Sequence, residues 1–393
     1  MPAPQFTVDD RIRIVKLPLL GGLSASYFLH RHWQKSPLLV RQAIPGFKGV
    51  LDFRAMTELA GRDDCESRLL LRSRRGWTVE YGPFARRRLL RLPPYNWTLL
   101  VQGVNLFLRE ARQLLCRFDF IPTARLDDLM VSYAPAGGGV GPHFDSYDVF
   151  LLQGAGRRRW RVGRQDDLTL VEGAPLRILQ RFMPQGECVL EAGDMLYLPP
   201  GYAHDGVALD DCYTYSVGFR APSHQELVSQ FLMFLEERLK PQGRYQDADL
   251  ATQAWPARIS PTMIARVQRA LRSIRWNRGD VAEFLGTYLT EPKPQVLFAP
   301  PPKPLAPRAF LRSARKYGLE LALPAQMLYS GATVFINGES LLMHARDARP
   351  LRQLADTRRL AGHDVPRGGP AAEVLYQWYR SGYILAPTRA VVI

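Results

Sequence analysis

The stretch GPHFD at residues 141–145 lies in a segment of short apolar runs that decides the fold of this chain. His143 and Asp145 are two residues apart, so on an extended strand their side chains leave the same face. His204 ends the later stretch PPGYAH at residues 199–204, directly after a Pro-Gly turn signal. Two imidazoles and one carboxylate can occupy one face of an octahedral ferrous ion and leave the other face open. We therefore take His143, Asp145 and His204, which we call the triad, as candidate metal ligands.

Short strand-like runs separated by Gly and Pro continue on both sides of this stretch, from residue 128 to residue 221. This pattern predicts a sandwich or a barrel. In a barrel, the strands between Asp145 and His204 can return the second histidine to the first. The alternative is that His143 and Asp145 cap a loop and that His204 lies on the surface. The expected strands cover residues 129–133, 148–153, 158–162, 188–190, 195–198 and 213–219.

The run RRRWRV at residues 157–162 indicates a cation inside the barrel. On a strand, Arg158, Trp160 and Val162 share one face, and the two apolar members mark that face as the inward one. Arg158 then points inward, where an unpaired charge is costly. A dicarboxylate such as 2-oxoglutarate would offset this cost through a bidentate contact. An internal Asp or Glu is the alternative partner.

Outside this segment the pattern is mixed or helical. Before it, helical spacing covers residues 52–60 and 104–118, and strands are expected at 67–74 and 76–81. After it, Ser223 followed by Glu226 predicts a capping box, and further helices are expected from Ser260-Pro261 and over residues 281–289. Apolar helices in this short segment could pair with a second copy of themselves, so we expect a homodimer.

A proline-dense run at residues 291–307 cannot continue a helix and predicts an extended linker. Beyond it, helices are expected near residues 308–317, 351–360 and 371–381, with a hairpin over 333–342 that turns at Asn337-Gly338. Helices mixed with a small hairpin resemble a winged-helix unit. We therefore expect four parts: a site-bearing domain at 1–222 with its barrel core at about 128–222, a helical dimerisation domain at 223–290, the linker at 291–307, and a winged-helix-like domain at 308–393.

The composition favours an intracellular protein. The net charge of +15 suits polyanionic surroundings such as RNA or an acidic membrane surface, although a soluble arginine-rich protein is an equal alternative. The four cysteines are far apart and form no C-x-x-C pair, which fits a reducing cytosol. Residues 1–5 lack the charged start of a signal peptide, and no stretch approaches the ~18 uninterrupted apolar residues of a membrane span. We expect a cytoplasmic location and no membrane partner.

Four stretches together resemble the JmjC-type ribosomal oxygenases. They are GGGVGPHFDSYDVF at 137–150, Gln153-Gly154 with RRRW at 157–160, GDMLYLPPG at 193–201 and YSVGFRAP at 215–222. The resemblance implies an α+β chain: a double-stranded β-helix (the cupin or JmjC barrel), a helical dimerisation segment and a C-terminal winged-helix-like domain. It also implies Fe(II), the co-substrate 2-oxoglutarate and O2.

The resemblance assigns roles around the co-substrate by matching position. It implies that the triad binds the iron and is catalytic, and that Arg158 holds the distal carboxylate of 2-oxoglutarate. Ser132 and Thr214 match positions beside the co-substrate. From the residues alone, both hydroxyls could equally be bonded to the sheet backbone.

The resemblance also implies a substrate. Asp128, Tyr147 and Ser216 match positions that hold a substrate arginine, and a carboxylate is the planar acceptor that a guanidinium needs. The alternative is that Asp128 lies at a solvated strand end and does not bind the substrate. The implied reaction is hydroxylation, at the β-carbon, of an arginine of large-subunit ribosomal protein sixteen, which would bring the enzyme near rRNA.

Two other functions stay open at the level of sequence. One is a JmjC hydroxylase or demethylase acting on another protein residue. The other is a catalytically silent RNA-binding ribosome-assembly factor, because residues 308–393 hold twelve Lys or Arg against six Asp or Glu. The run Arg86-Arg87-Arg88 and the positive net charge fit poorly with a basic ribosomal substrate, since like charges slow the encounter.

Overall fold

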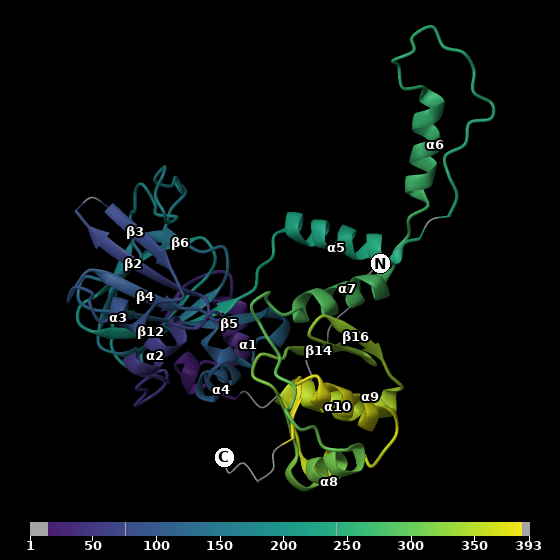
Figure 1. Cartoon of the computed structure of the whole chain (residues 1–393). Helices are drawn as coiled ribbons and strands as arrows, with labels where there is room; N and C mark the ends of the chain where they lie inside the picture. The colour runs from purple at the N-terminus through teal and green to yellow at the C-terminus, as the bar shows by residue number, and fades with distance from the viewer. Residues whose placement is uncertain (1–14, 75, 241, 387–393) are drawn as a thin grey trace, which may run out of the picture. The chain divides into compact units, whose positions relative to one another are not determined.

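The computed structural model describes residues 15–74, 76–240 and 242–386, which belong to two compact units (Figure 1). Unit 1 comprises Met1–Ala221 and Pro294–Leu297, and unit 2 comprises Pro222–Lys293 and Phe298–Ile393. Residues 1–5, on which the signal-peptide expectation rests, lie outside the described residues. Among the described residues, no helix combines the length and the apolar character needed to cross a bilayer.

Unit 1 is built on two antiparallel sheets. The larger sheet has the strand order β1-β10-β7-β12-β5-β4-β2-β3, and the smaller sheet has the order β6-β11-β8-β9. From β5 to β12 the chain passes repeatedly between the two sheets, which gives the double-stranded β-helix that the resemblance implied. The strands are β1 (Leu38–Val40), β2 (Ser67–Ser73), β3 (Gly76–Tyr81), β4 (Trp97–Val101), β5 (Leu126–Ala134), β6 (His143–Phe144), β7 (Val149–Ala155), β8 (Arg158–Arg164), β9 (Gly186–Leu190), β10 (Met195–Leu198), β11 (Tyr202–Ala208) and β12 (Cys212–Phe219).

The six strands expected in the barrel are all present, with ends that differ by at most a few residues. The expected strand ranges did not include β6 and β11, because the turn signals around GPHFD and PPG mask their short apolar content. The extended strand assumed for His143 and Asp145 is shorter than expected, since β6 ends at Phe144. Both strands belong to the smaller sheet, and both carry a histidine of the triad.

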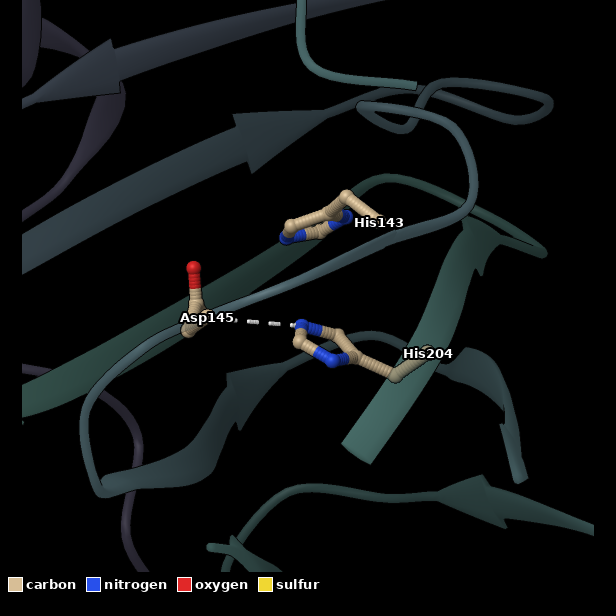
Figure 2. A group of neighbouring side chains, drawn as sticks. All are labelled: His143, Asp145 and His204. Atoms are coloured by element: carbon tan, nitrogen blue, oxygen red, sulfur yellow. Dashed lines mark ion pairs between the residues drawn. The ribbon is translucent and has the colours of Figure 1, made fainter. Parts of the chain in front are cut away.

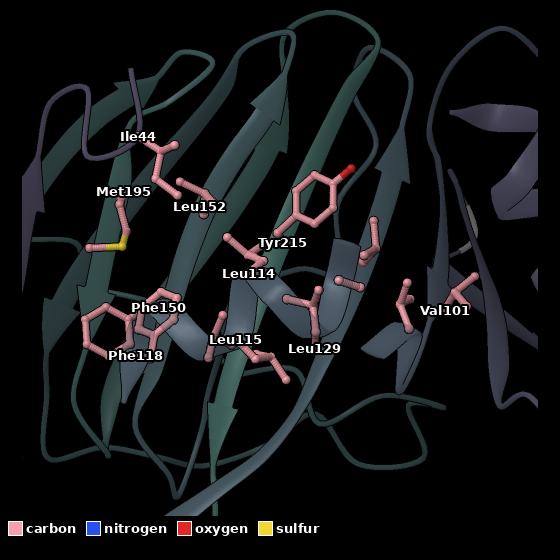
Figure 3. Packing of buried hydrophobic residues seen from close by; sticks show 14 of the residues in the cluster. Ile44, Val101, Leu114, Leu115, Phe118, Leu129, Phe150, Leu152, Met195 and Tyr215 are labelled. Atoms are coloured by element: carbon pink, nitrogen blue, oxygen red, sulfur yellow. The ribbon is translucent and has the colours of Figure 1, made fainter. Parts of the chain in front are cut away.

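The larger sheet has two chemically different faces, because successive residues of a strand point to opposite sides. One face carries Leu129, Phe150 and Tyr215 into the main hydrophobic core (Figure 3). Leu114 and Phe118 come from the helical layer that packs against this face. The other face turns polar residues of β5 and β12 toward the smaller sheet, so the core positions the site without taking part in it.

Helices of unit 1 supply that layer. They are α1 (Ala25–Arg31), α2 (Phe53–Ala60), α3 (Arg86–Leu89) and α4 (Arg109–Leu115), with 3-10 turns at Pro18–Leu20, Val104–Leu106 (η2), Cys116–Phe118 (η3) and Thr123–Arg125. The single helix expected over residues 104–118 is wrong in detail, since the structure divides it into η2, α4 and η3. Its apolar spacing holds nevertheless, because Val104, Leu114 and Phe118 are buried.

Unit 2 begins with α5 (His224–Arg238), α6 (Pro261–Arg272) and α7 (Arg278–Thr290). The side chain of Ser223 accepts a hydrogen bond from the Glu226 backbone at 3.1 Å, which confirms Ser223 as the N-cap of α5. Helix α7 packs on the neighbouring hairpin so closely that a Cβ at Gly286 would lie 2.3 Å from the Phe335 ring.

The remainder of unit 2 packs around a second core that includes Phe310, Leu351 and Trp378. Its elements are α8 (Pro307–Tyr317), β13 (Leu319–Leu321), β14 (Met327–Ser330), β15 (Thr333–Ile336), β16 (Glu339–Leu342), α9 (Ala345–Thr357), β17 (Arg359–Leu360), η5 (Gly362–Asp364), α10 (Pro370–Arg380) and β18 (Ile384–Leu385). Asn337 and Gly338 have φ angles of 50° and 87°, which confirms the hairpin turn between β15 and β16. The four-part domain division stays a prediction.

Candidate metal and co-substrate site

The smaller sheet brings the two histidines of the triad together. Strands β6 and β11 pair so that His143 lies directly opposite His204, with ring centroids 4.2 Å apart. Asp145 follows β6, and its Oδ2 is 3.7 Å from Nε2 of His204 (Figure 2). One ligand atom from each residue lies within 4.8 Å of the others. Three side chains at these separations can share one ion.

Backbone carbonyls fix which nitrogen each histidine offers. Nδ1 of His143 contacts the Gly141 carbonyl at 2.9 Å, and Nδ1 of His204 contacts the Tyr202 carbonyl at 3.0 Å. A carbonyl oxygen only accepts, so both Nδ1 atoms carry the hydrogen and both Nε2 lone pairs are left for a metal. Gly141 suits this turn because its φ is 81° and a Cβ there would lie 3.3 Å from Trp77.

The electrostatics of the site favour a neutral imidazole at His204. Burial lowers the pKa of His204 to about 4; His143 also lowers it, and Asp145 acts in the opposite direction. A neutral imidazole binds a metal without first releasing a proton. The triad thus offers two imidazole nitrogens and one carboxylate, which is the set that ferrous iron takes in oxygenases.

Arg158 is the second feature of the site, beside the metal-binding triad. It lies on β8, is 3% exposed, and its Nε and Nη2 atoms have no hydrogen-bond partner within residues 15–74, 76–240 and 242–386. The described residues also form no ion pair with it, so the alternative of an internal Asp or Glu partner is not observed. Its Cζ lies 5.7 Å from the centroid of the Trp160 ring. A buried guanidinium with orphaned donors is complementary to a carboxylate from outside the chain.

All nine candidate site residues border one cavity of about 450 Å³ in unit 1. The triad and Arg158 enter it from the smaller-sheet side. The remaining five lie on the side of the larger sheet. Strands β5 and β12 supply Asp128, Ser132, Thr214 and Ser216, and the loop before β7 supplies Tyr147. The structure therefore gathers every residue that the sequence proposed, while their individual roles stay predictions.

The two hydroxyls expected beside the co-substrate already have partners in the protein. Ser132 and Thr214 lie opposite each other on β5 and β12, and Ser132 Oγ is 3.5 Å from the Thr214 carbonyl. Thr214 Oγ1 donates to Gln153 Oε1 at 3.1 Å. The Thr214 proton is therefore committed to Gln153, whereas the 3.5 Å contact of Ser132 is long for a hydroxyl hydrogen bond and leaves that group able to turn to a ligand.

Two of the residues expected to meet the substrate, Asp128 and Ser216, lie deeper than a solvated strand end would, whereas Tyr147 is exposed. Asp128 is 3% exposed, and Gln102 Nε2 donates to both of its carboxylate oxygens, at 2.9 and 2.8 Å. Although Tyr147 is 41% exposed, its partial burial raises its pKa, and the charges of Asp145 and Asp128 raise it further. Ser216 lines the same wall. This part of the cavity is therefore rich in acceptors.

Sequence reasoning missed two groups of supporting residues. One is Gln102, which carries no local signal because a polar residue after an apolar strand is usually solvated. The other surrounds buried Asp148, whose carboxylate accepts from Tyr197 Oη at 2.6 Å, from Gln34 Nε2 at 3.0 Å and from Arg125 Nη2 at 3.5 Å. This network anchors the turn that carries Asp145.

Comparisons with known proteins agree with this geometry. Residues 113–227 match the JmjC domain family, and residues 273–384 match the ROXA-like winged helix family. The ribosomal protein uL16 3-hydroxylase of Escherichia coli K12 is 35% identical over 321 residues, covering 80% of this chain and 84% of that protein. A probable ribosomal oxygenase of Haemophilus influenzae is 41% identical over 211 residues, or 52% of each chain. The chain therefore belongs to the JmjC-domain ribosomal oxygenases.

Solved structures extend the similarity to the fold of both units. The X-ray structure of E. coli ycfD superposes with a TM-score of 0.83 at 32% identity, covering 92% of this chain and 98% of that one. The structure of the ribosomal oxygenase YcfD from E. coli in complex with cobalt and 2-oxoglutarate gives a TM-score of 0.78 at 32% identity, with coverages of 92% and 97%. The fold class inferred from sequence is thereby confirmed.

Proposed function

We propose that this protein is an Fe(II)- and 2-oxoglutarate-dependent dioxygenase that hydroxylates the β-carbon of an arginine in ribosomal protein uL16, the large-subunit protein sixteen. One observation carries the proposal: the triad borders the same cavity as buried Arg158, whose Nε and Nη2 have no hydrogen-bond partner in the part of the chain that the structure describes. A metal site alone would fit many activities. A metal site with an orphaned guanidinium fits a chelating diacid in particular.

The chain's own residues would divide the work between the two sides of the cavity. The triad would hold the iron through two Nε2 atoms and one carboxylate, and Arg158 would bind the far carboxylate of 2-oxoglutarate. Bound iron, with 2-oxoglutarate and O2, supplies the oxidising chemistry that converts a C–H bond to C–OH. Walls such as Trp160 and Leu151 would keep water from the reacting groups.

The substrate specificity would come from the larger sheet. Asp128 offers a buried carboxylate to the guanidinium, and Tyr147 and Ser216 border the same space. A planar acceptor matches the fork of N–H donors that arginine presents. The uL16 relative supplies the identity of the protein substrate, since its name specifies that ribosomal protein.

The test is aerobic incubation with purified uL16, Fe(II) and 2-oxoglutarate, followed by fragment mass spectrometry. We expect one added oxygen on a single arginine and, above the turnover without uL16, one succinate released per modified chain. Omitting 2-oxoglutarate or adding a chelator should leave the mass unchanged. An unmodified uL16 under complete conditions contradicts the proposal, and an oxygen on another residue or the loss of a methyl group favours the alternative hydroxylase or demethylase.

Proximity to rRNA is a further part of the proposal. Helix α8 presents Arg308, Arg312, Arg315 and Lys316 to solvent and contains no acidic residue. Such a face suits a polyanion, and it also supports the alternative of a silent RNA-binding factor. Succinate release that requires the triad separates the enzyme from that factor.

A homodimer in the cytoplasm completes the proposal. Within α6, the apolar side chains of Met263, Ile264, Val267 and Leu271 are exposed in the single chain. Exposed apolar patches of this kind mark association surfaces. Light scattering of the purified chain tests the dimer, which we expect at twice the mass of 44.6 kDa.

A further inference from the structure

The side chain of Gln102 lies against the carboxylate expected to bind the substrate arginine. It follows β4 directly, borders the cavity, and places Nε2 2.9 and 2.8 Å from the two oxygens of Asp128. A carboxylate only accepts, so the amide nitrogen and not its oxygen must face Asp128. The amide therefore fixes the plane of the carboxylate and leaves Oε1 of Gln102 as an acceptor beside it.

The turn that carries Gln102 holds the Asp128 strand at a second point. Asn105, fully buried, accepts a hydrogen bond from the Leu129 backbone through Oδ1 at 2.8 Å. Between these two contacts, Gly103 has a φ of 64°, and a Cβ there would lie 3.0 Å from Leu106 and 4.0 Å from Asp128 Oδ2. The turn can approach the carboxylate this closely because a glycine stands at its corner.

The turn is itself anchored to the neighbouring strand. The Gln102 backbone donates to the Glu66 carbonyl at 2.9 Å, just before β2 begins. Strands β2 and β4 lie outside the β5–β12 β-helix, in the extension of the larger sheet toward β3. An element outside the β-helix therefore controls the geometry of one wall of its cavity.

We propose that Gln102 is a positioning residue that makes the site selective for arginine. It holds the Asp128 carboxylate in one plane. Its Oε1 is a second acceptor, available to an N–H group of the guanidinium that Asp128 does not bind. Arginine has five N–H donors in a fixed plane and can use both acceptors, whereas lysine is a point charge that needs only the carboxylate. This inference rests on the proposed function, since it assumes a guanidinium at Asp128.

The test compares the wild type with Gln102→Leu and Gln102→Asn on two substrates: uL16, and uL16 with its modified arginine replaced by lysine. The binding of both substrates is measured under nitrogen with the metal-loaded protein, and 2-oxoglutarate turnover without uL16 is measured in air. We expect Gln102→Leu to weaken binding of the arginine substrate roughly tenfold or more, as loss of a hydrogen bond to a charged group does. The lysine substrate should lose much less, so the arginine-to-lysine preference shrinks.

Two further readouts separate positioning from a structural role. Substrate-free 2-oxoglutarate turnover and Tm are measured for each variant, because a merely structural role of Gln102 would lower both together. Gln102→Asn keeps an amide and should recover part of the preference, and Gln377→Leu on the exposed face of α10 is the matched control.

An equal loss of affinity for both substrates, no loss for either, or a fall in substrate-free turnover that parallels a fall in Tm would overturn the role of Gln102. Hydroxylation of uL16 by the wild type in the same experiment tests the proposed function separately. If the wild type modifies uL16 and Gln102→Leu binds it normally, only the present inference fails. If the wild type leaves uL16 unmodified, the proposed function fails and this inference fails with it.

Discussion

The two sides of the cavity differ in how far the protein satisfies its own polar groups. On the smaller-sheet side, two nitrogens of buried Arg158 have no hydrogen-bond partner among the described residues, and the ligand atoms of the triad lie within 4.8 Å of one another. On the larger sheet, the polar groups already have partners: Gln102 donates to Asp128, and Thr214 donates to Gln153. The difference indicates that the smaller-sheet side is incomplete without a metal and an anion, whereas the larger-sheet side is a preset surface that a substrate meets.

The largest effect should follow from removing a metal ligand. We expect His204→Ala to abolish uL16 hydroxylation and to lower metal affinity by more than the roughly 100-fold that loss of a partner behind a ligand costs. Metal content by elemental analysis and fragment mass spectrometry measure the two effects. His363→Ala, at an exposed histidine of unit 2, should change neither. Full metal occupancy in His204→Ala would remove that residue from the ligand set.

Arg158→Met should change function and stability in opposite directions. Loss of the bidentate contact should raise the KM for 2-oxoglutarate about 100-fold. Removal of an unpaired buried charge should raise the free energy of unfolding of the metal-free protein by roughly 1–3 kcal/mol. Kinetics and urea denaturation measure these changes, with Arg164→Met on the exposed end of β8 as the control. A destabilised Arg158→Met protein would show that the guanidinium has a partner in the folded chain.

Asp128→Asn should weaken the reaction with uL16 but leave the reaction with 2-oxoglutarate alone unchanged. The amide keeps one acceptor and loses the charge, so we expect kcat/KM for uL16 to fall about tenfold. Turnover of 2-oxoglutarate without uL16 should stay at the wild-type rate. A parallel loss of both activities would show that the two sides of the cavity do not act separately.

The smallest effect is expected at Thr214. Thr214→Val leaves Gln153 Oε1 without its donor and should lower the free energy of unfolding by about 1 kcal/mol. The KM for 2-oxoglutarate should change less than threefold, about 0.6 kcal/mol. Thermal denaturation and kinetics test this pair of values. A large rise in the KM for 2-oxoglutarate with unchanged stability would show that Thr214 binds the co-substrate and does not serve the sheet alone.

Sequence patterns predicted the candidate site well where side-chain chemistry is unusual. Two histidines and an aspartate near turns, and an arginine on the same face as Trp160, are rare enough combinations to stand out in a strand-rich segment. The supporting residues did not stand out. Gln102 and Asp148 are ordinary polar residues, and their importance arises from partners such as Asp128 and Tyr197 that lie far away in sequence.

The amino-acid order by itself determined which residues share a strand face, where most strands and helices lie, and which side chains carry the candidate chemistry. These features are local, because alternation along a strand and capping at a helix end involve neighbouring residues. Only the tertiary structure decided that His143 lies opposite His204 and that Gln102 meets Asp128. Strand pairing and register are set by the burial of a whole sheet face, so no short stretch contains them.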